Sequence, residues 1–123
     1  MPRAPYIPTI LVAAGILYAS LLTQPLAPLP HIRFADKWGH MLAYTCLSAI
    51  FLWDLTRAHA PRVRKYILVV VLPILYGGLI EILQEYFFPP RAGEWFDWLA
   101  DILGTFIGIG LMFPILRFTY RHD

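Results

Sequence analysis

Residues 66–91 read YILVVVLPILYGGLIEILQEYFFPPR, a stretch that is apolar at its start and acidic near its end. Between Tyr66 and Ile80 no residue carries a charge, and a run of this kind is typical of a helix that crosses a bilayer. Glu81 and Glu85 then follow within the same helical stretch. Because a carboxylate inside a membrane helix is costly, these two residues indicate either charged partners or a wet site nearby.

The composition of the whole chain agrees with a membrane protein. Of its 123 residues 59% are hydrophobic and only 15% are charged, and the mean hydropathy is positive. Soluble domains usually carry about 25% charged residues. The length accommodates about four spans of roughly 20 residues each, with no room for a further domain. We therefore predict an all-α fold, in which residues 1–123 form one bundle of four transmembrane helices over about 6–22, 36–55, 65–88 and 96–118.

Charge and cysteine content exclude several classes of function. The net charge is +2, and the basic residues stand at the ends of apolar runs instead of forming a stripe, so we expect no nucleic-acid partner. The single cysteine, Cys46, cannot form an intrachain disulfide. No motif predicts a cofactor. The partner that the sequence does predict is the lipid bilayer.

The distribution of Lys and Arg predicts the orientation of the helices. Taking loops on alternate sides, seven basic residues fall on one side and three on the other. The larger set is Arg3, Arg57, Arg62, Arg64, Lys65, Arg117 and Arg121, and the smaller set is Arg33, Lys37 and Arg91. Basic loops stay in the cytoplasm, so both termini are expected there. A cleavable signal peptide is the alternative to the first span, but no small-residue cleavage site precedes the proline-rich residues 23–31.

Polar side chains gather at the end of the predicted bundle that faces outward. Residues four apart share a helix face, which aligns polar groups at the start of the second helix, the end of the third and the start of the fourth. The candidate ligand-binding residues are Asp36, Lys37, His40, Tyr44, Glu81, Gln84, Glu85, Arg91, Asp97 and Asp101. Charges at span ends also serve as caps and interfacial anchors. Glu81, Gln84 and Asp101 lie deeper, where a functional site or polar network is favoured. Gly104 and Gly108 below them form a G-x-x-x-G pair, which lets two helices approach closely.

Three blocks of the sequence resemble the VanZ-like family of small bacterial membrane proteins. They are DKWGHMLAY at residues 36–44, YGGLIEILQEYFFPPR at residues 76–91 and FDWLADILGTFIG at residues 96–108. The motif positions of the family fall on Asp36, Lys37, His40, Tyr44, Glu81, Gln84, Arg91, Asp97, Asp101, Gly104 and Gly108. Asp101 stands where the family often has Asn, which adds a carboxylate to the cluster.

The resemblance implies a multi-pass protein of the bacterial plasma membrane that is connected with the cell envelope. The name of the family comes from a member associated with low-level tolerance to the glycopeptide antibiotic teicoplanin. The resemblance implies no particular reaction. It therefore suggests a place of action, and the chemistry has to be argued from the residues.

Three kinds of function fit the predicted polar site. As a binding module, it would use Arg91 and Lys37 to contact the phosphate or carboxylate of an envelope lipid or peptidoglycan-precursor head group. As an enzyme, it would use His40 and the carboxylates to hold a divalent metal or to transfer protons. Against an enzyme stands the lack of an H-E-x-x-H motif or a phosphate-binding loop. A structural network or a proton path is the third alternative.

Overall fold

The computed structural model describes residues 6–21, 35–87 and 95–119. These residues form helices, and the one connection among them is a short turn at residues 58–61. The helices are α1 (Ile7–Leu21), α2 (Ala35–Arg57), α3 (Arg62–Phe87) and α4 (Trp95–Thr119). The prediction of four helices is confirmed for the described residues, which contain no strand, and each observed helix end lies within three residues of its expected position.

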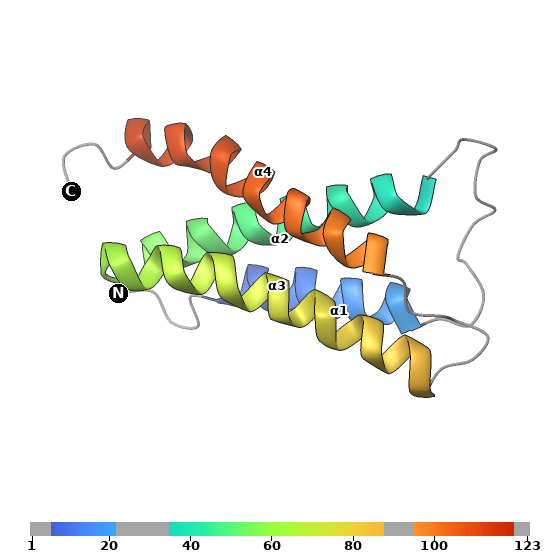
Figure 1. Ribbon diagram of the computed structural model, residues 1–123. Helices are drawn as coiled ribbons and strands as arrows, with labels where there is room; N and C mark the ends of the chain where they lie inside the picture. The colour runs from blue at the N-terminus through green and yellow to red at the C-terminus, as the bar shows by residue number, and fades with distance from the viewer. Residues whose placement is uncertain (1–5, 22–34, 88–94, 120–123) are drawn as a thin grey trace.

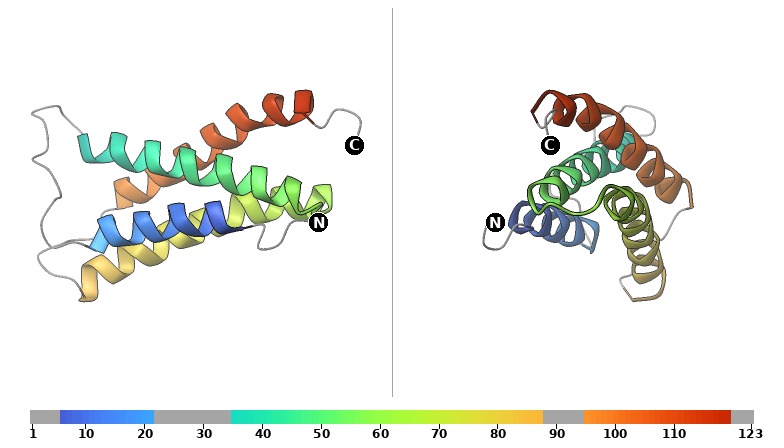
Figure 2. Two further views of the ribbon diagram at one scale, coloured as in Figure 1. Left: turned by 180° about the vertical axis from the view of Figure 1, so that it is seen from behind. Right: turned by 90° about the vertical axis from the view of Figure 1, so that its left-hand side faces the viewer.

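The helices alternate in direction, so that neighbours in the sequence run antiparallel (Figure 1). The end of α3 and the starts of α2 and α4 consequently lie at the same end of the bundle, which we call the outer end. Helix α2 packs against each of the other three helices, which Figure 2 shows from behind and along the bundle. The most extensive packing is between α2 and α4. This topology brings the three polar segments of the sequence to one end of the molecule.

Two of the described helices are long and apolar enough to cross a membrane. They are α3, over Arg62–Tyr86, and α4, over Trp95–Thr119. The apolar part of α1 is shorter, and α2 has 23 residues but is more polar. Pro73 and Pro114 lie inside α3 and α4, where proline is better tolerated in a membrane than in water because neighbouring groups can satisfy the freed carbonyls.

A compact turn at residues 58–61 makes α2 and α3 antiparallel neighbours. His59 has a φ of 60°, its amide donates to the Thr56 carbonyl at 3.0 Å, and the Ala60 amide donates to the Leu55 carbonyl at 3.0 Å. These two bonds form a Schellman motif, which satisfies carbonyls at a helix end. The motif usually has glycine where this chain has histidine, so the sequence alone does not reveal it. Pro61 follows and ends any continuation of α2.

The inner end of the bundle combines an apolar core with one buried carboxylate. Phe51, Leu52, Leu55, Val69 and Leu116 form the core. Asp54 is fully buried and accepts hydrogen bonds from the Thr9 amide at 3.0 Å, from the Thr9 hydroxyl at 2.6 Å and from Arg57 Nη2 at 2.6 Å. Three donors of this kind satisfy a carboxylate away from water. Asp54 therefore fastens α1 to α2, and it is remote from the polar groups of the outer end.

The G-x-x-x-G pair of α4 lies against α2. A Cβ atom at Gly104 would collide with the backbone carbonyl of Met41, and one at Gly108 would collide with Ser48 and Thr45. The Ser48 hydroxyl donates to the carbonyl of Thr105, at 2.9 Å, across this contact. The close approach predicted from the two glycines is thus present, and its partner is α2. It sets the spacing between the helices that carry His40 and Asp101.

We expect Gly104→Ala to lower the free energy of unfolding by about 1–3 kcal/mol, the usual cost of overpacking a tight contact. The backbone of Met41 cannot move aside as a flexible side chain would. Gly110→Ala is the matched control, because a Cβ at Gly110 meets open space on the same helix. It should be neutral or stabilise by up to about 1 kcal/mol through helix propensity. Denaturant titration in micelles, followed by circular dichroism, measures both variants, and equal effects would contradict this packing.

Candidate functional site

His40 stands at the centre of the polar group at the outer end. It lies on the second turn of α2, and its side chain is 15% exposed. Its Nδ1 atom is 2.9 Å from Asp101 Oδ1, and its Nε2 atom is 3.6 Å from Asp97 Oδ2. The first distance is a hydrogen bond and the second is longer than one. The two nitrogens therefore face two carboxylates from successive turns of α4.

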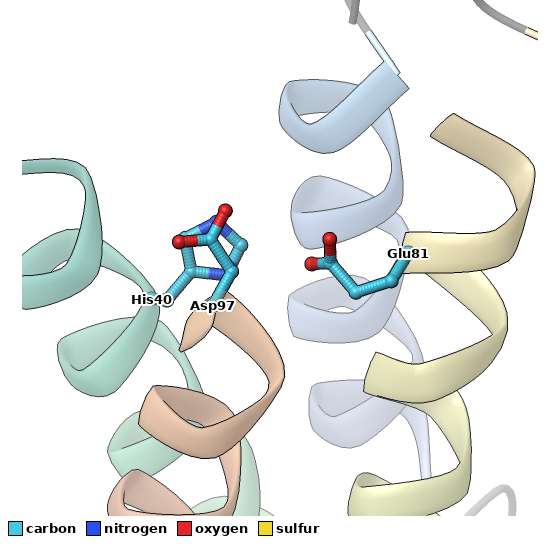
Figure 3. A group of neighbouring side chains, drawn as sticks. All are labelled: His40, Glu81 and Asp97. Atoms are coloured by element: carbon cyan, nitrogen blue, oxygen red, sulfur yellow. The ribbon is translucent and has the colours of Figure 1, made fainter. Parts of the chain in front are cut away.

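Three carboxylates of this cluster are buried. The exposed fraction is 3% for Glu81, 7% for Asp97 and 1% for Asp101. Buried carboxylates are uncommon unless they are paired, hydrogen-bonded or bound to a metal. Glu81 comes from the end of α3, and its carboxylate points toward His40 and Asp97 (Figure 3). We call His40, Glu81, Asp97 and Asp101 the outer polar site.

The register between α3 and α4 is set by two adjacent glycines of α3. A Cβ at Gly77 would lie 2.7 Å from Asp101 Oδ2, and one at Gly78 would lie 3.2 Å from Trp98 Nε1. Trp98 uses this space to donate a hydrogen bond from Nε1 to the Ile74 carbonyl at 2.9 Å. This bond joins α4 to α3. The glycines bring the backbone of α3 close to the polar site.

Gln84 and Tyr76 connect α3 to α1. Gln84 Nε2 donates to the Ser20 carbonyl at 2.5 Å, and the Tyr76 hydroxyl donates to the Ala13 carbonyl. Gln84 is 2% exposed, and its buried Oε1 has no hydrogen-bond partner among the residues that the structure describes. The amide nitrogen of Gln84, a predicted ligand-binding residue, thus binds α1, whereas its oxygen can still accept a hydrogen bond from a ligand. The acceptors on α1 are backbone carbonyls, which leave no signal in the sequence.

The remaining predicted site residues fall into three groups. Tyr44 is buried, 1% exposed, one turn of α2 below His40. Glu85 is exposed on α3, whereas Glu81 on the same helix is buried. Asp36 and Lys37 belong to α2, but their side chains lie outside the described part of the structure, as does Arg91 as a whole. The structure therefore assembles His40, Glu81, Asp97 and Asp101, with Tyr44 and Gln84 adjoining them on the same helices.

An apolar cavity of about 340 Å³ opens between α1, α2 and α3. Its lining residues are Thr9, Ala13, Leu47, Phe51, Leu72, Pro73, Leu75, Tyr76 and Leu79. Tyr76 lines the cavity, while the next residue, Gly77, borders Asp101. The same stretch of α3 therefore lines the cavity with one side and borders the outer polar site with another. We call this cavity the apolar groove.

Three of the four groups are arranged so that they can hold a metal ion. One ligand atom each from His40, Glu81 and Asp97 lies within 4.8 Å of the other two. Imidazole nitrogen and carboxylate oxygen are ligands of Zn²⁺ and of related divalent ions. The same groups also suit proton transfer or recognition of a polar head group. No known protein family, characterised protein or solved structure matches this chain.

Proposed function

We propose that the chain is a four-span membrane protein of the VanZ-like family, and that its outer polar site binds the head group of an envelope lipid. The three sequence blocks that resemble the family supply every member of this site, because His40 comes from the first, Glu81 from the second and Asp97 and Asp101 from the third. A site assembled from all three blocks is what a shared function would require.

The distribution of side chains supports four spans instead of two. The exposed surface is rich in large apolar residues on every helix, for example Leu11, Leu42, Leu75 and Phe106, which are 52–66% exposed. The buried set includes Ser48, Asp54, Glu81, Gln84, Asp97, Asp101 and Thr105. Water-soluble proteins rarely expose such large apolar areas, whereas lipid solvates them. The excess of basic residues at the inner end supports cytoplasmic termini in a bacterial plasma membrane.

The single observation that carries the binding function is that α3 borders both the buried polar site and the apolar groove. A lipid has a polar head joined to apolar chains, and here Tyr76 of α3 lines an apolar cavity while the next residue, Gly77, borders the buried Asp101. A groove of about 340 Å³ accommodates part of one acyl chain while the head group contacts the polar site. A peptide head group without a lipid chain would leave the groove unused, so the lipid is the better fit.

Native mass spectrometry of protein extracted gently with its lipids tests this function. The wild type should retain a stoichiometric lipid. Glu81→Gln should retain much less, because losing a charge-assisted hydrogen bond costs about 1.5–3 kcal/mol, or roughly 10- to 150-fold in affinity. Ala13→Phe, which narrows the groove without altering a polar group, should lower lipid retention as well.

Glu85→Gln is the matched control for Glu81→Gln, since it makes the same change at an exposed position of the same helix. It should retain lipid like the wild type. Equal lipid loss in both variants, or a wild type that retains no lipid, would contradict head-group binding at this site.

A second function is favoured by the contact between His40 and Asp101. A carboxylate at 2.9 Å from one ring nitrogen fixes the histidine in the arrangement of a general base with its orienting group. An enzyme that transfers a proton to or from a lipid head group would use this pair. The same mass spectra discriminate the two, because turnover converts the retained lipid into a product of different mass.

A further inference from the structure

The hydrogen bond to Asp101 determines how His40 presents its second nitrogen. A carboxylate only accepts hydrogen bonds, so Nδ1 must carry the proton of the 2.9 Å contact with Asp101 Oδ1. In the neutral ring Nε2 then offers a lone pair. A carboxylate that holds the other ring nitrogen in this way is the usual support of a metal-binding histidine, because it fixes the tautomer and raises the basicity of the ligand nitrogen.

The surroundings of Nε2 supply further ligands at the spacing that a metal requires. Asp97 Oδ2 lies 3.6 Å away, which is too long for a hydrogen bond. With metal–ligand bonds of about 2.1 Å, two ligands at this separation subtend roughly 120° at the ion, close to the tetrahedral angle. Two groups that both offer lone pairs are stable side by side when a positive charge, either an ion or a proton, lies between them.

Glu81 completes a set of three ligands, one from each of three helices. The three ligand atoms lie within 4.8 Å of one another. Ligands of a tetrahedral ion are about 3.4 Å apart, so the Glu81 carboxylate has to move by up to about 1.4 Å to bind with the other two. Figure 3 shows that carboxylate directed toward His40 and Asp97 across a short gap. A change of this size needs only a rotation of the side chain.

We infer that His40 Nε2, Glu81 and Asp97 bind a divalent transition-metal ion of the zinc type, with Asp101 as the positioning residue. The imidazole favours such ions over Mg²⁺ and Ca²⁺, which prefer oxygen ligands alone. The ion would join the outer ends of α2, α3 and α4. Three protein ligands leave a coordination position open, as in catalytic zinc sites. This inference goes beyond head-group binding and does not depend on it.

Metal binding by tag-free protein in micelles tests the inference directly. The protein is stripped with a chelator and titrated with Zn²⁺ alone against a competing chromogenic chelator. The wild type should bind one ion per chain, and His40→Ala should bind it at least about 100-fold more weakly, since a structural ligand is lost. Asp101→Asn should weaken binding by about 10- to 100-fold, the usual effect of removing the supporting carboxylate of a ligand histidine.

A second readout separates a metal ligand from a residue that is needed only for folding. Zn²⁺ should raise the unfolding temperature of the wild type and of Glu85→Gln, because a ligand that binds only the folded state stabilises it. It should not raise that of His40→Ala, Glu81→Gln or Asp97→Asn, even where these variants are folded without metal.

Ala13→Phe separates this inference from the proposed function. It should bind Zn²⁺ like the wild type and yet lose lipid, since Ala13 lines the groove and is not one of the three metal ligands. A wild type that binds Zn²⁺ no more tightly than His40→Ala overturns the metal site and leaves a protonated His40 between its carboxylates. Such a result would not affect the lipid measurement.

Discussion

A cysteine introduced at Ala92 is expected to react with a membrane-impermeant maleimide in intact cells, whereas a cysteine at Pro61 is not. Both are made in a Cys46→Ala background, because Cys46 is the only thiol of the chain. Ala92 belongs to the segment between α3 and α4, and Pro61 to the turn between α2 and α3. These segments lie at opposite ends of α3, so one helix that spans the bilayer must separate them completely. Mass shift of the purified protein measures the labelling.

Permeabilised cells provide the control, since both cysteines should then react. The reverse pattern in intact cells would place the outer polar site in the cytoplasm and contradict a role at the envelope surface. Labelling of both positions in intact cells would mean that α3 does not span the membrane. Pro61 is preferable to His59 of the same turn for this purpose, because His59 occupies a left-handed conformation that few residues tolerate well.

The number and bounds of the helices were predictable because each helix corresponds to one long apolar run of the sequence. Charged segments such as residues 62–65 and prolines such as Pro61 interrupt apolar runs whose lengths match a helix that crosses a bilayer. The manner in which α2 ends was not predictable, since His59 takes a backbone conformation that normally indicates glycine. A local exception of this kind changes the shape of a turn without moving the helices that it joins.

Helical periodicity identified the members of the outer polar site but not the register between its helices. Sequence spacing predicts only that Glu81 and Asp101 both lie deeper than the charges at the span ends. In the structure Asp101 lies opposite Gly77, and Glu81, one turn further out, groups with Asp97. Register depends on how glycines and side chains interlock across a helix pair, and one sequence without a partner surface does not contain that information.

The same register explains why Glu85 is exposed although it lies four residues from Glu81. The helices α3 and α4 are antiparallel, so moving one turn outward along α3 corresponds to moving one turn toward the start of α4. Glu81 is level with Asp97 in the first turn of α4, which begins at Trp95. Glu85 is one turn, or about 6 Å, further out along α3, beyond the level at which α4 begins. Periodicity within one helix cannot foresee where its neighbour ends.

Backbone acceptors were the other feature that the sequence did not reveal. Tyr76, Gln84 and Trp98 each donate to a carbonyl of another helix. Every residue has a carbonyl, so no residue type signals such a partner. Glycines at positions 77 and 78 were the available sign that α3 approaches another helix closely, and they lie against Asp101 and Trp98 of α4.

If the chain performs the function that the VanZ-like resemblance implies, the intact protein should raise the tolerance of a susceptible bacterial host to teicoplanin. His40→Ala and Glu81→Gln should each return that tolerance to the level of the host without the protein. Both changes remove a member of the outer polar site, and Glu81→Gln does so with almost no change of shape. Because neutralising a carboxylate lowers the cost of placing it in a membrane helix, the amount of Glu81→Gln in the membrane should equal or exceed that of the wild type.

Growth at graded teicoplanin concentrations, together with immunoblots of isolated membranes, measures both effects in the same cells. Glu85→Gln is again the matched control and should confer full tolerance, because its side chain is exposed on the same helix. Variants that disappear from the membrane, with full tolerance from the protein that remains, would make the outer polar site a structural network. A wild type that confers no tolerance would remove the link to the antibiotic, and lipid and Zn²⁺ binding would then test the site by themselves. Full membrane abundance combined with lost tolerance is the result expected here, since a polar site that binds a ligand is needed for activity more than for insertion into the membrane.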